Sequence, residues 1–176
     1  MKFTETKIKG VWIIELERRE DSRGFFARTW CQKEFEAHGL TSHLKQINAG
    51  FTTKAGGVRG LHFQLPPHAE AKTVRCTMGA LYDVAVDIRP DSPTYKQWVG
   101  AELTADNHRT LYIAEGCAHG YQTLVDNTEI LYLTTAFHAP DSAAGYRYDD
   151  QAFGISWPLP IGIVSEADCR WPAFNG

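Results

Sequence analysis

Histidine, lysine, tyrosine and aspartate side chains in four separate segments have the chemistry needed to move protons. The first segment, residues 58–64, contains His62, with Arg59 before it and Lys72 ten residues after it. Histidine has an ordinary pKa of about 6.5 and can accept a proton near neutral pH. A lysine ammonium can stabilise the negative charge that proton removal leaves behind. A cation is a poor neighbour for an imidazole, so these cations weaken the alternative that His62 is purely structural.

Three further segments carry polar side chains that could act with His62. Glycines flank His119 within residues 115–121, which is typical of a tight turn that exposes a side chain. Tyr132 lies in a strand-like segment, where taken alone it is an ordinary core aromatic residue. Asp168 ends the segment 165–168, and taken alone it is typical of a surface or capping residue. A tyrosine with a pKa near ~10 stays protonated at neutral pH and can donate a proton.

The sequence does not favour a metal or a bound cofactor. Metal-binding cupins carry two histidines at positions i and i+2, then a glutamate and a later histidine. Here Gln64 stands two residues after His62, and the ammonium of Lys72 occupies the region where an acid is needed. Only His62 and His119 remain, fewer than the three or four protein ligands usual for a metal. The sequence also lacks a glycine-rich phosphate loop and a Gly-x-Ser-x-Gly elbow, so we expect no cofactor.

Short β-strands must position these side chains. β-Branched, aromatic or alternating residues predict strands at residues 8–16, 58–64, 81–88, 110–114 and 129–137. Glycine, proline and asparagine turns separate them, as in a sandwich or jelly roll. Within residues 58–64, the period of two places Gly60, His62 and Gln64 on one face and Leu61 and Phe63 on the other.

Helices are expected to be few. One is predicted from Lys33 to His38 and ends at Gly39, and a second short helix is predicted near residues 165–168. The sequence therefore predicts an all-β domain that spans residues 1–176 and has a concave interior for a small ligand.

Composition excludes several functional classes. With 43% hydrophobic and 22% charged residues, the chain has the profile of a soluble globular protein. The net charge of −3 and the absence of a long basic run argue against nucleic-acid binding. The N-terminus does not resemble a signal peptide, and no apolar run approaches the ~18 residues that span a membrane. The widely spaced Cys31, Cys76, Cys117 and Cys169 predict free thiols and a cytoplasmic location.

Taken together, the motifs resemble the RmlC-type dTDP-4-dehydrorhamnose 3,5-epimerases, which are cofactor-free cupins. The resemblance covers nearly the whole chain, and the motifs occur in the family's order and spacing. The matching segments are Asp21–Phe26, Gly57–Gln64, Asp83–Arg89 with Ser92–Thr94, Ala118–Tyr121, Tyr132, Ile155–Pro158 and Ser165–Asp168.

The resemblance implies a cupin-type jelly roll, or double-stranded β-helix, that forms a homodimer. It also implies that an N-terminal segment extends to the neighbouring subunit. His62 would remove a proton beside the C4 ketone of a nucleotide-linked 4-keto-6-deoxy sugar, and Asp168 would fix its tautomer. Lys72 would stabilise the enolate oxygen, and Tyr132 would donate a proton from the opposite face of the ring. The ketone acidifies C3 and C5, so neither a metal nor a redox cofactor is required.

The resemblance implies binding roles for further residues. Arg59 and His119 would bind phosphate or sugar oxygens. The positions that match the family's nucleotide contacts are Arg23, Phe26, Gln46 and Asn48.

Two substrate-binding positions depart from the family pattern. Arg28 stands where the family usually has an acid near the nucleoside, which leaves a CDP- or other nucleotide-linked sugar open. His138 stands where the family usually has a second tyrosine near the sugar, which leaves a 3-mono-epimerase open. Drift within an ordinary 3,5-epimerase accounts equally for both. A sugar-binding cupin without activity has no need for a base and an opposing acid, and a metal-dependent dioxygenase lacks the ligands.

Overall fold

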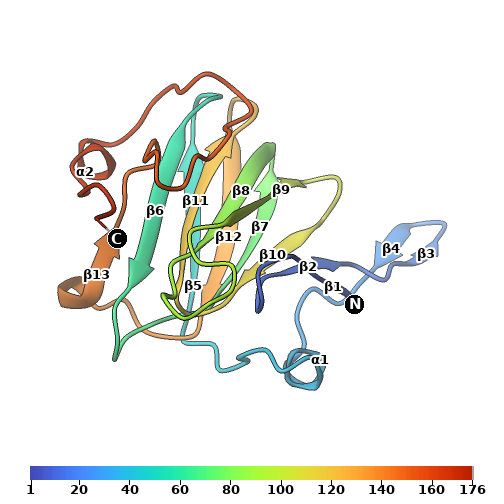
Figure 1. The fold of residues 1–176 in the computed structure, drawn as a ribbon. Helices are drawn as coiled ribbons and strands as arrows, with labels where there is room; N and C mark the ends of the chain where they lie inside the picture. Colours follow the sequence, from blue (N-terminus) through green and yellow to red (C-terminus); the bar gives the residue numbers. More distant parts are fainter. Residues whose placement is uncertain (176) are drawn as a thin grey trace.

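The protein is built from two antiparallel β-sheets and a small projecting ribbon (Figure 1). The computed structural model describes residues 1–175. In spatial order, the six-stranded sheet contains β1 (Lys2–Glu5), β2 (Trp12–Glu15), β10 (Thr110–Ile113), β7 (Lys72–Met78), β12 (Thr128–Thr134) and β5 (Gln46–Thr52). The five-stranded sheet contains β13 (Ala143–Gly145), β6 (Val58–Gln64), β11 (Cys117–Thr123), β8 (Ala80–Asp87) and β9 (Trp98–Thr104). The ribbon contains β3 (Arg19–Asp21) and β4 (Gly24–Phe26).

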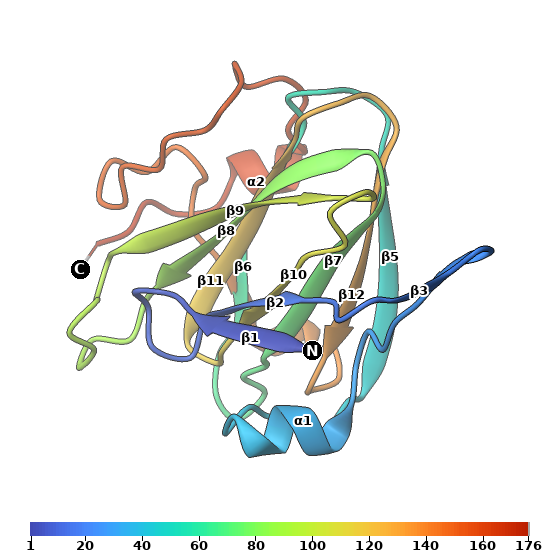
Figure 2. The same ribbon diagram turned by 90° about the vertical axis from the view of Figure 1, so that its right-hand side faces the viewer.

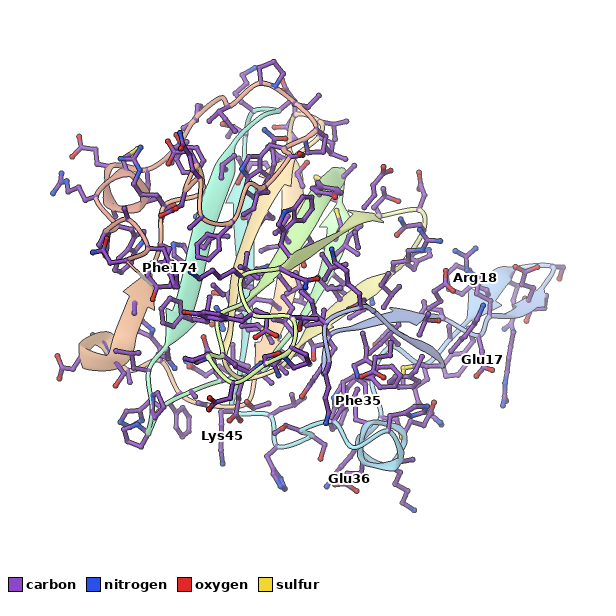
Figure 3. All side chains as sticks on the ribbon, in the orientation of Figure 1. Glu17, Arg18, Phe35, Glu36, Lys45 and Phe174 are labelled. Carbon is purple, nitrogen blue, oxygen red and sulfur yellow. The ribbon has the colours of Figure 1, made fainter. Side chains whose placement is uncertain are left out.

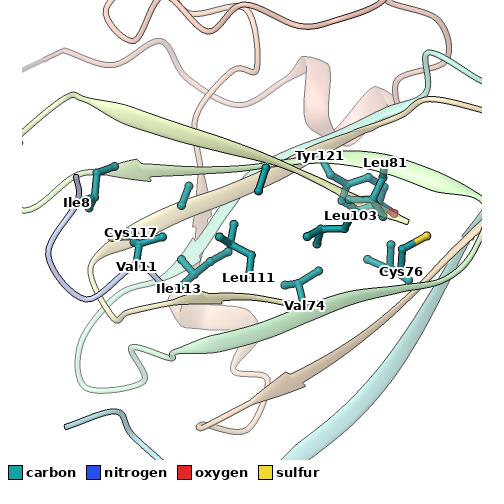
Figure 4. Packing of buried hydrophobic residues seen from close by; sticks show 13 residues of the cluster. Ile8, Val11, Val74, Cys76, Leu81, Leu103, Leu111, Ile113, Cys117 and Tyr121 are labelled. Carbon is teal, nitrogen blue, oxygen red and sulfur yellow. The ribbon is translucent and has the colours of Figure 1, made fainter. Parts of the chain in front are cut away.

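The two sheets face one another and enclose an apolar core (Figure 4). Val74 and Leu111 of the six-stranded sheet and Leu81 and Leu103 of the other are fully buried there. Burying a side chain of this kind contributes about 1.5–3 kcal/mol. This arrangement confirms the predicted all-β jelly roll of the cupin type.

Most predicted strands are confirmed, but two are shorter than predicted. The segment 8–16 becomes a strand only from Trp12, because Gly10 adopts a left-handed φ of +84° within a turn. The segment 129–137 leaves the sheet after Thr134. Beyond that point side chains replace the strand ladder: Gln46 Oε1 accepts the His138 N–H at 2.6 Å, and Gln64 Oε1 accepts the Ala139 N–H at 2.7 Å. Strand propensity cannot predict side-chain hydrogen bonds of this kind.

Both predicted helices are present. Helix α1 (Gln32–Ala37) buries Phe35 against the six-stranded sheet, and Gly39, whose φ is +69°, terminates it after the cap residue His38, as predicted. Helix α2 (Glu166–Cys169) begins after Ser165, whose hydroxyl accepts the Asp168 N–H at 3.0 Å. This cap fixes the backbone of Asp168 and therefore the direction of its side chain. No helix within residues 1–175 is long and apolar enough to cross a membrane.

The β3–β4 hairpin stands away from the rest of the chain (Figure 2). All six of its strand residues are exposed. Figure 3 labels Glu17 and Arg18 at its base, far from Phe174 at the other side of the molecule. The α-ammonium of Met1 anchors that base, since it donates to Glu17 at 2.6 Å and to Glu34 at 2.8 Å.

Candidate active site

Two adjoining cavities of about 570 and 230 Å³ lie between the two sheets. His62, Lys72 and Tyr132 line both of them and therefore stand at their junction. The other lining residues of the larger cavity are Gln46, Asn48, Phe63, Gln64, Glu70, Thr134, His138, Ala143, Ala144 and Trp171. The smaller cavity adds Ala49, Gly50, Arg59, His119, Tyr121 and Ile130.

His62 and Asp168 form a histidine–carboxylate pair on one wall of the cavity. His62 Nε2 lies 2.5 Å from Asp168 Oδ1, and the aspartate side chain is only 6% exposed. Burial alone would raise the pKa of Asp168, but the hydrogen bond and charge of His62, with further donors, bring that pKa below its ordinary value. Asp168 is thus a carboxylate that accepts the Nε2 proton. This tautomer makes Nδ1 the ring nitrogen that can accept a proton.

Strand β6 presents His62 to the cavity because of a close approach to β11. Gly60 has a φ of +127°, and a Cβ added there would lie 2.5 Å from Gly120 Cα. Only glycine fits this contact. The approach brings His62 directly opposite His119 in the ladder between the two strands. As predicted, Leu61 turns the other way and packs in a separate apolar cluster, whereas Phe63 packs at the edge of that cluster and also lines the larger cavity.

Tyr132 and Lys72 stand on the opposite wall, which the six-stranded sheet supplies. Burial, and then the negative charge of Glu70, raise the pKa of the Tyr132 phenol, against a smaller lowering by Arg59. Tyr132 therefore holds its proton throughout the neutral range. Lys72 Nζ lies 3.2 Å from Glu70 Oε1, and both side chains are about nine-tenths buried. The cavity thus has an imidazole on one wall and a phenol with an ammonium on the other.

Arg59 and His119 contribute positive or polar groups to the smaller cavity. The Arg59 guanidinium donates to the Phe51 carbonyl at 3.0 Å and to Thr52 Oγ1 at 3.3 Å. His119 Nε2 lies 2.7 Å from Asp83 Oδ1, and the Asp83 side chain is fully buried. Among the described residues, Asp83 Oδ2 and Tyr121 Oη are buried without a hydrogen-bond partner. The Arg59 guanidinium and the Tyr121 hydroxyl therefore offer hydrogen-bond donors to oxygen atoms at this end of the cavity.

Gln46, Asn48 and His138 line the larger cavity, as the predicted binding set requires. Gln46 and Asn48 alternate along β5 with outward-facing Ile47, which is 63% exposed. Their spacing of two residues places both on the inner face.

Three predicted binding residues do not join the cavity. Arg23 and Phe26 lie on the projecting hairpin, where the Arg23 side chain is 88% exposed and Phe26 is 69% exposed. Arg28 pairs with Glu34 at 2.8 Å near the hairpin base. Within one chain, the predicted site is therefore divided between the cavity and the hairpin.

The sequence-based reasoning missed three residues of the site. Glu70 lies two positions before Lys72, a spacing that places both on one side of an extended chain. Trp171 lines the cavity, and its Nε1 donates to Asp168 Oδ1 at 3.4 Å. Asp83, the partner of His119, stands in an alternating strand whose inward face was predicted, but nothing in the sequence pairs it with a histidine.

The described residues contain no group of three or more histidine, cysteine, aspartate or glutamate side chains placed to hold a metal ion. The side chains at the centre of the cavity are instead an imidazole, an ammonium and a phenol. They are suited to proton transfer beside a polarised carbonyl group.

A family model described as dTDP-4-dehydrorhamnose 3,5-epimerase matches residues 5–176. The chain belongs to this family. As a member of this epimerase family it is an isomerase. The dTDP-4-dehydrorhamnose 3,5-epimerase of Salmonella typhimurium strain LT2 is 44% identical over 177 residues, which cover 99% of this chain and 96% of the relative. That of Sinorhizobium fredii is 42% identical and covers 99% of this chain and 90% of the relative.

Solved structures of the family have the same architecture. The Bacillus anthracis dTDP-4-dehydrorhamnose 3,5-epimerase, crystallised with TDP and PPi bound, superposes with a TM-score of 0.94. It is 39% identical, and the match covers 98% of this chain and 99% of that one. The Legionella pneumophila enzyme in complex with dTDP-4-keto-L-rhamnose superposes with a TM-score of 0.89 at 35% identity, covering 96% of this chain and 89% of that one.

Proposed function

We propose that this enzyme inverts C3 and C5 of dTDP-4-dehydro-6-deoxy-D-glucose and yields dTDP-4-dehydro-L-rhamnose for surface polysaccharide. The observation that carries the proposal is the cavity in which the His62–Asp168 pair faces Tyr132 from the opposite sheet. Inversion of a carbon centre requires a base on one face of the sugar ring and an acid on the other. The Bacillus anthracis relative holds TDP and PPi, and the Legionella pneumophila relative holds dTDP-4-keto-L-rhamnose.

His62 begins each inversion. The C4 ketone acidifies the C–H bonds at C3 and C5, and His62 Nδ1 takes the proton while the bonding electrons move to the C4 oxygen. Asp168 holds the Nε2 proton, which orients the imidazole and stabilises the imidazolium that forms. The Lys72 ammonium lies on the facing wall, where it stabilises the enolate oxygen.

Tyr132 completes each inversion. Its phenol protonates the enolate carbon from the face opposite His62, and the C4 carbonyl reforms. His62 has then gained one proton and Tyr132 has lost one, so exchange with solvent restores both before the second centre reacts. The raised pKa of Tyr132 keeps the phenol protonated and ready to donate. The reaction is redox-neutral, so acid and base side chains are sufficient for it.

The smaller cavity is proposed to bind the polar atoms beyond the sugar ring. Arg59 and His119 lie there, and an arginine guanidinium matches the geometry of phosphate oxygens. Gln46 and Asn48 supply amide donors and acceptors to the larger cavity. We assign these four residues to the diphosphate, sugar and nucleotide of the substrate.

A homodimer is proposed to complete the site. Arg23 and Phe26 project from an exposed hairpin outside the cavity between the sheets, where Phe26 lines only a small hollow of about 120 Å³, so the predicted nucleotide contacts of both residues require a second surface. An apolar hollow of about 360 Å³ lies on the outer face of the six-stranded sheet, and Ile47, Leu131 and Leu133 line it. Trp30 Nε1 and Arg75 Nε line the same hollow and, among the described residues, are buried without acceptors. A second copy of the chain covers this face and receives the hairpin.

Subunit mixing tests the shared site. The variants His62→Ala and Arg23→Ala/Phe26→Ala are each expected to be impaired, the first in its cavity and the second in its hairpin. Random exchange makes half of the dimers mixed, and one of the two sites in each mixed dimer is intact, so about a quarter of the sites regain activity. A mixture no more active than the sum of its components would reject the shared site.

Deuterium uptake from D2O tests the reaction itself. Incubation with dTDP-4-dehydro-6-deoxy-D-glucose followed by NMR is expected to place deuterium at both C3 and C5. No label at either carbon would reject this substrate, and the CDP-linked sugar would be tested next because Arg28 stands near the predicted nucleoside site.

A 3-mono-epimerase is the second candidate, and His138 favours it. This residue lines the larger cavity, and Gln46 holds its backbone N–H at 2.6 Å. An imidazole at the cavity wall differs in size and proton affinity from a phenol. Label at C3 alone in the same experiment would establish this alternative.

The cytoplasm remains the proposed location, since all four cysteines are unpaired thiols in the structure.

A further inference from the structure

Glu70 introduces a negative charge into a site that must bind negative groups. Among the cavity-lining residues that the structure describes, it is the only one that carries a carboxylate. The proposed substrate has a diphosphate, and its reaction passes through an enolate, so a carboxylate in the wall opposes both by charge repulsion. A nine-tenths buried acid in this position calls for a compensating role.

The backbone holds Glu70 and Lys72 in a fixed relation. Ala71 lies between them, and its N–H donates to Thr135 Oγ1 at 2.8 Å while its carbonyl accepts the Thr135 N–H at 3.1 Å. These two bonds pin the chain at the entry to β7. The carboxylate and the ammonium then meet at 3.2 Å, with side chains that are 10% and 11% exposed. At this depth the pair is screened by water far less than a surface ion pair.

Tyr132 lies on the same wall as this pair. In the ladder between β7 and β12, Thr134 is opposite Lys72 and Tyr132 is opposite Val74. The period of two places Tyr132 and Thr134 on one face of β12, and both line the cavity with Glu70 and Lys72. Glu70 therefore acts on both groups that the proposed reaction requires opposite His62.

We propose that Glu70 is a positioning residue that holds the Lys72 ammonium at the cavity wall and places a negative charge on the wall that carries Tyr132. This role rests on the proposed epimerase function. Glu70 touches no reacting atom; it acts through the ammonium that receives the enolate and through the acid that protonates it. The other charged or titratable groups that face the cavity are His62 and Arg59 on β6, His119 and Tyr121 on β11, and His138 after β12.

The decisive variant is Glu70→Gln, which keeps the shape of the side chain and removes its charge. Loss of the charge removes one of the two causes that raise the pKa of Tyr132, so that pKa should fall. The alkaline limb of the kcat profile should move to lower pH with it. A displaced ammonium should lower kcat about tenfold at neutral pH. KM should not rise, since an anion facing the diphosphate has been removed.

Glu70→Asp separates position from charge. It keeps the carboxylate but shortens its reach, so kcat should fall while the alkaline limb stays close to that of the unmodified protein. Glu129→Gln is the matched control, because it makes the same chemical change on the Tyr132 strand at a residue that does not line the cavity. It should alter neither kcat nor the pH profile.

A substrate-free titration keeps this test independent of the proposed reaction. The near-ultraviolet absorbance of tyrosinate is followed against pH, and the difference from Tyr132→Phe isolates the Tyr132 transition. If Glu70→Gln does not shift that transition, the role is rejected, whether or not the sugar nucleotide is turned over. The role is equally rejected if Glu70→Gln lowers kcat only in proportion to lost folded protein, as melting curves would reveal. If Glu70→Gln does not fold, Glu70→Asp takes its place in the test. A shift of the alkaline limb in Glu70→Asp, which keeps the charge, would then reject the proposed role.

Discussion

The cavity and the β3–β4 hairpin carry two parts of one predicted site under opposite physical conditions. In the cavity, side chains are half-buried or buried and are held by specific partners, such as Asp168 for His62 and Glu70 for Lys72. On the hairpin, Phe26 is 69% exposed, and the only ion pair of the Arg23 side chain within residues 1–175 is the local one with Asp21. The cavity is organised by the fold of one chain, whereas the hairpin is organised only at its base.

This difference shows which part of the predicted site a single chain can form. Four buried polar atoms lack partners among the described residues, and they fall into two pairs. Tyr121 lines the smaller cavity and Asp83 is the partner of His119 there, while Trp30 and Arg75 line the outer hollow, the face proposed for a second copy of the chain. We infer that the cavity determines the chemistry and the hairpin determines the affinity for the nucleotide.

His62→Ala should have the largest effect and should act on kcat alone. Removal of the base is expected to reduce kcat by about 10³-fold or more, because general base catalysis contributes up to that order. Circular dichroism and the melting temperature should stay close to those of the unmodified protein, since the His62 ring is not part of the apolar core. If His62→Ala retained the full rate, the cavity would not be the site of the chemistry. The contrast between a catalytic cavity and a binding hairpin would then fail.

Tyr132→Phe should have the second largest effect. Net epimerisation is expected to fall about 10²-fold, because the phenol that protonates the opposite face is missing. His62 is intact, so exchange of the C3 proton with D2O should remain measurable by NMR. Equal loss of exchange and of epimerisation would place Tyr132 on the same step as His62 and would contradict two opposed walls.

Phe26→Ala should change KM rather than kcat. Stacking of a base on an aromatic ring contributes about 1–3 kcal/mol, so KM should rise roughly tenfold. Steady-state kinetics with the dTDP-linked sugar measure both constants. Phe25→Ala serves as the control, because Phe25 lies on the same hairpin but packs on His108 and Arg18 of its own chain. A fall in kcat with unchanged KM would show that the hairpin shapes the chemistry.

Alkaline pH should have the smallest effect and should act through the hairpin base. Burial alone would lower the pKa of the Met1 ammonium, but hydrogen bonds to Glu17 and Glu34 outweigh it and raise that pKa. A group with a raised folded pKa stabilises the protein fully below its unfolded pKa, near ~8, and loses this effect as pH rises through the folded value. KM should therefore rise by less than about threefold once the pH exceeds the folded pKa of the Met1 ammonium. A variant with an N-terminal extension should show this higher KM at all pH values.

Periodicity was sufficient to place His62. The alternation in residues 58–64 correctly separated His62 from Leu61, but a bulge in β6 breaks the period of two and brings Arg59 to the same cavity as His62. The helix ending at Gly39 followed from the conformational freedom of glycine. These features depend on residues close together in the chain, and local physics determines them.

Residue patterns could not predict contacts between side chains that are far apart in the sequence. Asp168 meets His62 across 106 positions, and only the family resemblance indicated that contact. The Glu70–Lys72 pair is local in sequence, but its burial depends on the bonds between Ala71 and Thr135. Only the family resemblance assigned Arg23 and Phe26 to the site, and within one chain the structure places both outside the cavity.

The location of Asp168 has a consequence for protein synthesis. The last strand of the roll ends at Gly145, and Asp168 follows on the segment that runs back over β6 through the bridge between Val58 and Val164. A nascent chain emerging from the ribosome can thus close its two sheets before the carboxylate that orients His62 has been made. Shortened products that end before Ser165 would keep the strands of the roll and lack the histidine–aspartate pair. Full translation is then a condition for turnover more than for folding.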